Sequence, residues 1–215
     1  MTTINVLVLG PQGSGKGTQA TRISAAHGVP HVSTGDMFRA AIADGTELGR
    51  QVEPILVSGE LVPDELTIAL IRDRLAKDDA AGGFVLDGFP RNAVQAEALD
   101  EMLRAIGRPL DAVLFFQLDD ETATRRVGSR AHEEGRSDDT PEVMARRLAI
   151  YHEQTEPVVE RYRAAGTLHT LNAGRSVADV FAEIETALAT SPGQLPAVDD
   201  GGLSGGSRSS REASP

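Results

Sequence analysis

The sequence contains no cysteine, so it can form neither a disulfide nor a thiolate metal site. It also lacks the roughly 20 consecutive apolar residues that a membrane helix needs. Its opening run, residues 1–9, has no basic flank of the kind that begins a secretory signal. We therefore expect a cytoplasmic protein that binds neither zinc nor a membrane.

Lysine is also scarce, because the chain has only Lys16 and Lys77 beside nineteen arginines. The formal net charge is -11 at pH 7, so the general surface repels a phosphate backbone. We therefore expect no nucleic-acid partner, and any anion site has to be local.

With 215 residues, 40% of them hydrophobic, the chain can bury one substantial core. Apolar runs rich in β-branched and aromatic residues, each followed by a helix-like stretch, predict an α/β fold with a parallel sheet flanked by helices. The strand-like runs are 4–9, 84–86, 112–118 and 167–171. The helix-like stretches are 16–26, 64–77, 92–106, 121–130, 142–163 and 177–188.

Several element ends and one domain boundary can be predicted. Asp64 follows Pro63 as an expected helix cap, and Thr140 precedes Pro141 at an expected first turn. Three glycines stand where helices should stop: Gly28, Gly107 and Gly166. After residue 190 the composition changes to Gly, Ser, Pro and Asp, so we expect one domain over 1–190 and a disordered tail over 191–215.

A glycine-rich turn at residues 10–18, Gly-Pro-Gln-Gly-Ser-Gly-Lys-Gly-Thr, stands between a strand-like run and a helix-like stretch. Glycines let successive backbone N–H groups converge on a phosphate, and the helix N-terminus adds partial positive charge. The context favours a P-loop over a glycine turn without a ligand, with Lys16 at the terminal phosphates. The residues that this loop assigns to ATP are Gly13, Ser14, Gly15, Lys16, Gly17 and Thr18.

Lys16 is followed by Gly17 rather than by the Ser or Thr of the general P-loop pattern. The hydroxyl that usually binds magnesium is therefore displaced to Thr18. This departure disfavours a GTPase or a motor ATPase, and the Asn-Lys-x-Asp motif of translation-type GTPases is absent.

Two later segments indicate an acceptor site. Residues 33–36 open a helix, with Thr34 at a capping position and Arg39 one turn later. A buried run ends in Asp87, and the following turn projects Arg91 from the carboxyl edge of the sheet, where ligands of open α/β sheets bind. We expect Asp87 to hold Mg²⁺ through water rather than to act as a simple helix cap.

Arginines also crowd one segment of this acidic chain: Arg125, Arg126, Arg130, Arg136, Arg146 and Arg147. Planar guanidinium groups suit the negative charge that gathers during phosphoryl transfer. A solvated charged face is the alternative for such a cluster, and the P-loop upstream favours the functional interpretation.

Five motifs appear in the order typical of adenylate kinases, and the resemblance covers about residues 4–189. The motifs are residues 10–18, 33–36, 61–65, 87–91 with Gln95, and 135–139. The short connector after Ala131 resembles the short-lid form of the family.

The resemblance implies reversible, Mg²⁺-dependent phosphoryl transfer between ATP and AMP by a monomer, in adenine nucleotide homeostasis. It implies an AMP-binding insertion over 33–62 and a short lid at about 130–140. The residues that it places at AMP are Thr34, Arg39, Glu60, Leu61, Val62, Gly88, Phe89, Pro90, Arg91, Gln95, Arg136 and Arg147. It assigns Arg126 and Arg175 to ATP and Arg130 to the transferring phosphates, whereas Arg125 and Arg146 receive no role.

The sequence leaves two alternatives to phosphoryl transfer between ATP and AMP. Another small-molecule P-loop kinase is the first, and Thr34 and Gln95 favour AMP, because pyrimidine monophosphate kinases resemble this chain less at those positions. A nucleotide sensor without turnover is the second, and the presence of the expected arginines disfavours it. The five histidines lack metal spacing, so we interpret all of them as structural or surface residues.

Overall fold

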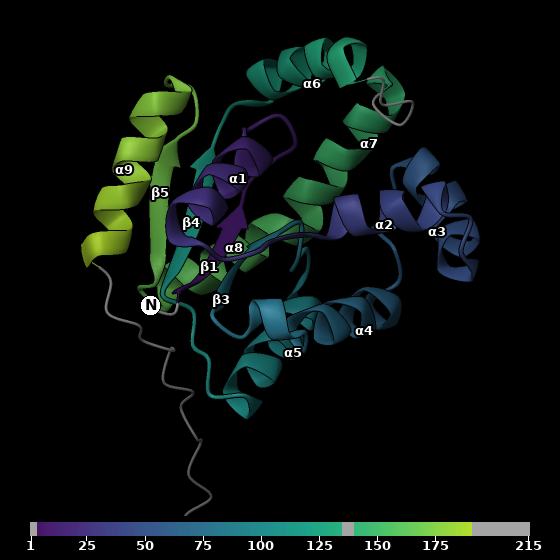
Figure 1. Ribbon diagram of the computed structural model, residues 1–215. Helices are drawn as coiled ribbons and strands as arrows, with labels where there is room; N and C mark the ends of the chain where they lie inside the picture. Colours follow the sequence, from purple (N-terminus) through teal and green to yellow (C-terminus); the bar gives the residue numbers. More distant parts are fainter. Residues whose placement is uncertain (1–3, 135–139, 191–215) are drawn as a thin grey trace, which may run out of the picture.

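The computed structural model describes residues 4–134 and 140–190, with side chains for 4–129 and 140–190. Within these residues, parallel strands form one five-stranded sheet in the order β2-β3-β1-β4-β5 (Figure 1). The strands are β1 (Ile4–Leu9), β2 (His31–Ser33), β3 (Gly83–Asp87), β4 (Ala112–Gln117) and β5 (Leu168–Asn172). The central strand β1 pairs with β3 on one side and with β4 on the other. The predicted α/β fold with a parallel sheet is thus confirmed.

The helices follow the strands along the described chain. They are α1 (Lys16–His27), α2 (Thr34–Ala43), α3 (Glu47–Ser58), α4 (Asp64–Leu75), η1 (Asp78–Ala80), α5 (Ala93–Ala105), α6 (Asp120–Glu134), α7 (Pro141–Ile150), η2 (Tyr151–Thr155), α8 (Glu156–Ala164) and α9 (Val177–Thr190). None of these helices is long and apolar enough to cross a membrane.

The sheet is covered by helices on both faces, because alternate residues of a strand point to opposite sides. On one face, Val6 of β1 belongs to a buried cluster with Ile23 of α1 and Ile184 of α9. On the other face, Leu7 belongs to a larger cluster that includes Tyr162 of α8 and residues of α4 and α5. The strands β1, β3 and β4 are mostly apolar because both of their faces are largely buried, whereas the edge strand β5 is mostly half-buried or exposed.

Two smaller units extend from this three-layered body (Figure 1). We call α2 and α3 the α2–α3 insertion, and its core of Phe38, Val52 and Val62 is separate from the sheet. The second is the α6–α7 pair, whose small core includes Val127 and Met144. The predicted tail, 191–215, and residues 135–139 of the predicted lid lie outside the described residues.

Some predicted helix ends are confirmed and others are wrong. The hydroxyl of Thr140 accepts a hydrogen bond from the Val143 N–H at the start of α7, as expected of a cap. Asp64 instead begins α4, and its carboxylate accepts hydrogen bonds from the side chains of Asn92 and Gln95. The three predicted glycine stops are confirmed by a left-handed conformation at each site: Gly28, Gly107 and Gly166.

Two helices differ from their predicted limits. The cap of α2 is Ser33, whose extended backbone lets its hydroxyl accept a hydrogen bond from Asp36, so Thr34 is the first helical residue rather than the cap. The stretch predicted as one helix over 142–163 contains the π-helical turn η2, which separates α7 from α8.

Candidate nucleotide and phosphate site

A cavity of about 770 Å³ lies at the carboxyl ends of β1 and β3, where the strand order changes direction. Open α/β sheets bind ligands at such a switch point, because the loops after the strands diverge there. The glycine-rich turn, Asp87, Arg91, Arg126 and Arg147 all line this cavity. The sequence-predicted donor and acceptor segments therefore meet in one place.

The glycine-rich turn keeps its shape because side chains cannot occupy it. Gly13 has φ +78°, and a Cβ there would lie 2.5 Å from the Ala123 carbonyl oxygen. Gly15, at the cap of α1, is also left-handed. The turn consequently lies directly against α6 and continues into the N-terminus of α1. The backbone N–H groups at such a helix start suit an anion.

Lys16 is the first residue of α1, and its ammonium group reaches back over the turn. Its Nζ donates hydrogen bonds to the Gly10 and Pro11 carbonyl oxygens, each at 2.7 Å. The positive charge is therefore held beside the mouth of the turn, where a phosphate on the backbone N–H groups would meet it.

Several buried polar atoms around the cavity have no hydrogen-bond partner among the described residues. They are Gln12 Oε1, Ser14 Oγ, Gln19 Oε1 and His31 Nε2, all from residues that line the cavity. Leaving a buried polar group unpaired costs about 1–3 kcal/mol. Their concentration around one cavity indicates that a polar ligand completes them.

Asp87 ends β3 beside the phosphate loop. Its Oδ2 lies 3.5 Å from His31 Nε2 and 3.6 Å from the position of a Cβ on Gly17. His31 also lines the cavity, and its interpretation as a structural or surface residue stays a prediction. Among the described side chains, no group of three or more His, Asp or Glu residues could hold a metal without help from a ligand.

The turn after β3, with the side chains that hold it in place, forms one wall of the cavity, which we call the acceptor wall. The Gly88 carbonyl oxygen accepts hydrogen bonds from Thr34 Oγ1 at 2.9 Å and from Arg91 Nε at 2.8 Å. The backbone N–H of Arg91 donates to Gln95 Oε1 at 2.9 Å, and Gln95 Nε2 donates to Asp64. These bonds fix both the backbone and the guanidinium of Arg91.

Three arginines approach one another at this wall. Burial lowers the pKa of the Arg91 guanidinium, and the charges of Arg147 and Arg39 lower it further, against the opposing effect of Asp87. A cluster of cations in a partly buried cavity is stabilised by an anion, and phosphate matches guanidinium geometry. The arrangement therefore suits a phosphate group.

The predicted site residues do not all face the cavity. Gly88, Phe89, Pro90, Glu60 and Leu61 line it. Thr34, Gln95 and Val62 are buried and are not among the described residues that line the cavity. Arg136 lies outside the described residues, and only the backbone of Arg130, in α6, is described.

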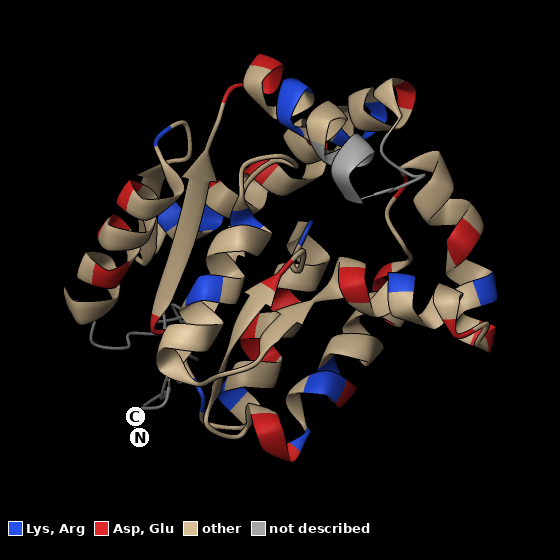
Figure 2. Cartoon of the chain, turned by 45° about the horizontal axis from the view of Figure 1, so that its top comes forward, with Lys and Arg blue, Asp and Glu red and all other residues tan. Residues whose placement is uncertain are grey.

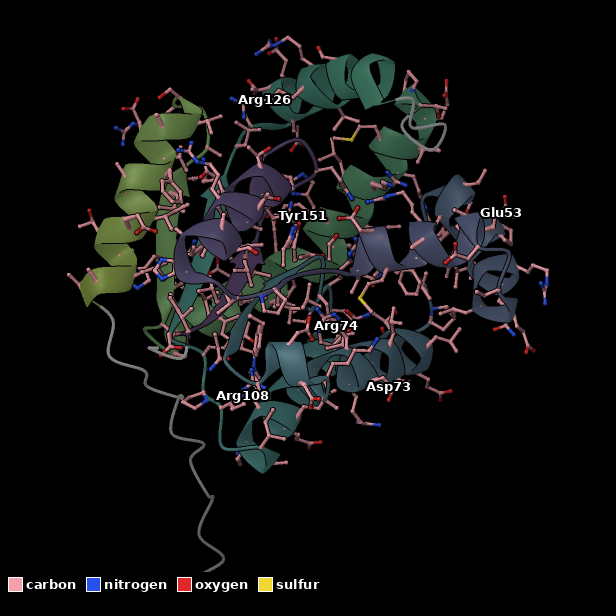
Figure 3. All side chains as sticks on the ribbon, in the orientation of Figure 1. Glu53, Asp73, Arg74, Arg108, Arg126 and Tyr151 are labelled. Atoms are coloured by element: carbon pink, nitrogen blue, oxygen red, sulfur yellow. The ribbon has the colours of Figure 1, made fainter. Side chains whose placement is uncertain are left out.

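Arg126 and Arg175 also line the cavity. Arg126 Nη1 donates to the Ala173 carbonyl oxygen at 2.9 Å, and Figure 3 shows Arg126 on α6 at the top of the molecule. Arg175 pairs with Glu183 of α9 at 3.0 Å. Basic turns mark α6 and α7 in Figure 2, whereas α9 carries acidic ones.

The turn η2 contributes residues that the sequence did not assign to the site. Tyr151 and Thr155 line the cavity, and Figure 3 places Tyr151 near the centre of the molecule. Thr155 Oγ1 donates to the Arg91 carbonyl oxygen at 2.8 Å. A helical pattern gives no signal of a π turn, because the apolar spacing on either side stays helical.

The phosphate loop and its lysine thus share one cavity with the arginine-rich wall that follows β3. Such a fold and site define a P-loop kinase that acts on a small phosphorylated acceptor. Residues 8–167 match the family model described as adenylate kinase. The adenylate kinase of Parvibaculum lavamentivorans is 48% identical over 87% of this chain and 93% of that protein.

Two further relatives are similarly close. The adenylate kinases of Thermobifida fusca and Caulobacter vibrioides are 48% and 49% identical, each over 86% of this chain and at least 97% of their own length. The chain belongs to the adenylate kinase family, which confirms the resemblance seen in the motifs. It is an enzyme of that type, and enzymes of this family transfer a phosphoryl group reversibly between ATP and AMP to give two ADP.

Proposed function

We propose that this chain performs that transfer in the single cavity described above, with ATP on the phosphate loop and AMP on the arginine wall. The observation that carries the proposal is the meeting of Lys16, from the loop after β1 at the start of α1, and Arg91, from the turn after β3, in one lining. The α2–α3 insertion, which has its own core, is the proposed AMP-binding insertion over 33–62.

The proposed mechanism is positioning and charge neutralisation rather than proton abstraction. The AMP phosphate has a second pKa of about 6, so it is largely dianionic near neutral pH and can attack in line without a protein base. Lys16 holds the terminal phosphates of ATP, and Arg91, Arg147 and Arg39 hold the AMP phosphate. Arg130 and Arg136 are proposed to complete the charge at the transferring group.

The residues near the loop fit Mg²⁺ delivered with ATP. Mg²⁺ in such enzymes is held by one or two protein oxygens together with water and substrate phosphates. Asp87 offers a carboxylate beside Gly17, and Thr18 lines the cavity with a hydroxyl. When bound, the ion would neutralise phosphate charge, and we propose Asp87 as its partner through water.

Recognition of the AMP base is proposed to depend on Thr34 and Gln95. Both are nearly fully buried, and both contact the turn that carries Arg91. They therefore shape the acceptor wall from behind. On the donor side, Arg126 is proposed to contact ATP and Arg175 to line the pocket of its adenine. We also propose that the enzyme is a cytoplasmic monomer, as is typical of the family.

The two lysines of the chain allow a matched test. Lys16→Met should lower turnover with ATP and AMP at least about a hundredfold, because charge stabilisation of the transferring group is lost. Lys77→Met, which removes the same charge outside the cavity lining, should leave turnover within about twofold. Equal turnover in Lys16→Met and the wild type, with both variants folded by circular dichroism, would refute the assignment.

A further inference from the structure

The α2–α3 insertion and the α6–α7 pair meet over the cavity through a contact that has little apolar content. Each unit has a small hydrophobic core of its own, and none of the buried clusters of the described residues combines the two. Among the described residues, this contact includes Glu60 with Arg146, Leu56 with Arg147, and Gly59 with Val143. It is therefore a polar junction between two separately packed units.

The ion pair is the strongest part of this junction. Arg146 donates from Nη2 at 2.6 Å and from Nε at 2.8 Å to the same oxygen, Oε1 of Glu60. The two residues are 86 positions apart, so the pair joins α7 to the segment just after α3. About half of each side chain is exposed, at 54% for Arg146 and 45% for Glu60.

The backbone contact beside the pair is close. Gly59 ends α3, and a Cβ there would lie 3.1 Å from both Val143 Cγ1 and the Val143 carbonyl oxygen. One turn further along α7, Arg147 donates from Nη2 to the Leu56 carbonyl oxygen at 3.3 Å. The insertion thus lies against one face of α7 over a short length.

A junction of this kind opens at low cost, because few apolar contacts are lost and the charged groups regain water. Leu56, Gly59, Glu60 and Arg147 also line the cavity. Opening the junction therefore separates two parts of the cavity wall, one from the insertion and one from α7.

We propose that Glu60 and Arg146 form a latch that holds the α2–α3 insertion against α7 when the acceptor is bound. The two residues are positioning residues, since they act through the insertion and not on the transferring phosphoryl group. The latch rests on the proposed assignment of the insertion to AMP. It gives Arg146 a role distinct from that of Arg147, its neighbour in the cavity wall.

Two simpler explanations make different predictions. An exposed ion pair that does nothing leaves every kinetic constant unchanged when either partner is neutralised. A Glu60 that only faces the AMP phosphate repels it, so Glu60→Gln would strengthen AMP binding. The latch predicts the opposite sign, because the neutral side chain no longer holds Arg146.

The test is a double-mutant cycle on steady-state kinetics with ATP and AMP. Glu60→Gln and Arg146→Gln should each raise the KM for AMP about two- to fivefold, the range open to an exposed ion pair. The kcat and the KM for ATP should stay within about twofold. The double neutral variant should be no worse than either single variant, because the two act as one unit.

The charge exchange, Glu60→Arg with Arg146→Glu, supplies the rescue. It should return the KM for AMP to within about twofold of the wild type, which a loss of folding could not do. Arg74→Gln is the matched control, because Arg74 pairs with Asp79 at 2.8 Å outside the cavity lining and should leave the KM for AMP unchanged. Figure 3 shows Arg74 in the lower part of the molecule.

A lower KM for AMP in Glu60→Gln, or additive effects of the two neutral variants, would overturn the latch. So would an Arg146→Gln enzyme with unchanged constants. Wild-type turnover with AMP tests the proposed function separately, so a failed latch leaves that function intact, and an absent turnover with AMP is recognised before any variant is compared.

Discussion

Arg91 shows how single residues give an acidic protein an anion site. The chain has a net charge of -11, but the surroundings of Arg91 are locally cationic. Burial and the charges of two neighbouring arginines lower the pKa of its guanidinium. The group remains a cation, because the guanidinium of arginine is not deprotonated in proteins. Its position is secured by hydrogen bonds to both Gly88 and Gln95, so the cation is in place before a phosphate arrives.

His152 is a second residue whose surroundings predict a measurable effect. Its ring nitrogens lie 2.9 Å from Asp120 at the start of α6 and 2.9 Å from Glu156 of α8. Hydrogen bonds to Asp120 and then to Glu156 raise the pKa of the imidazole above its ordinary value of 6.5. The protonated form, which can donate to both carboxylates, is therefore favoured by folding.

The sign of the pH dependence follows from the raised pKa. The stabilisation is complete below the ordinary pKa and is lost as the pH rises through the higher pKa of the folded state. His152→Gln should therefore lower the free energy of unfolding at about pH 6, by less than about 1 kcal/mol because the ring is partly exposed. At about pH 9 the same substitution should change the free energy of unfolding by almost nothing. Melting curves at both pH values measure this. An equal loss at the two pH values would contradict it.

At this scale, the sequence predicts which segments meet at the cavity but not how each of their side chains is oriented. Lys16, Asp87 and Arg91 follow strand ends, and the carboxyl edge of a parallel sheet brings them together. Thr34 and Gln95 share the same motifs, yet they lie behind the wall. A motif gives no information about which of its side chains turns inward, because that depends on caps such as Ser33.

At the scale of elements, the α2–α3 insertion depends on one close helix contact. Gly49 near the start of α3 faces the end of α2, and a Cβ there would lie 2.1 Å from the Ala41 carbonyl oxygen. No side chain fits at that distance, so α2 and α3 owe their closeness to this glycine. The sequence did not predict α3, since its apolar residues pack mainly within the insertion.

Gly49→Ala should separate α2 from α3 and destabilise the insertion by about 1–3 kcal/mol, the usual cost of overpacking. The KM for AMP should rise more than the KM for ATP, because the insertion belongs to the acceptor side. Thermal melting and steady-state kinetics measure the two effects.

Gly128→Ala in α6 is the control for this change. A Cβ there meets nothing within 4 Å, and alanine favours a helix over glycine by up to about 1 kcal/mol. Its melting temperature should be unchanged or higher. Equal destabilisation by both substitutions would show that the contact between α2 and α3 is not what the first one disturbs.

The strands were more predictable than the helices. A strand buried on both faces is a continuous apolar run, so β1 was predicted with its observed limits and β3 and β4 within one residue at each end. The partly buried β5 was predicted one residue early, and β2 was not among the predicted strand-like runs. The turn η2 was missed because the apolar spacing on either side of it stays helical. That turn nevertheless brings Tyr151 and Thr155 into the cavity lining.

At the scale of the whole molecule, the sheet with its helical layers and the two smaller units differ in the size of their cores. The sheet and its two helical layers contain the large clusters, and they carry the phosphate loop and Asp87. The α2–α3 insertion and the α6–α7 pair have small cores and meet through polar contacts. Units of low local stability suit closure over substrates, which excludes water from ATP.

We propose that the cavity is shaped for AMP as acceptor, and a panel of acceptors measures this preference directly. Purified enzyme with ATP and Mg²⁺ is assayed for ADP formation with AMP, CMP, UMP and GMP in turn. The catalytic efficiency with AMP should exceed the others at least about a hundredfold, or roughly 2.7 kcal/mol. Thr34→Ala with Gln95→Asn should narrow that gap, mainly by weakening AMP, and leave the KM for ATP unchanged. Comparable wild-type efficiency with CMP or UMP would contradict the claim.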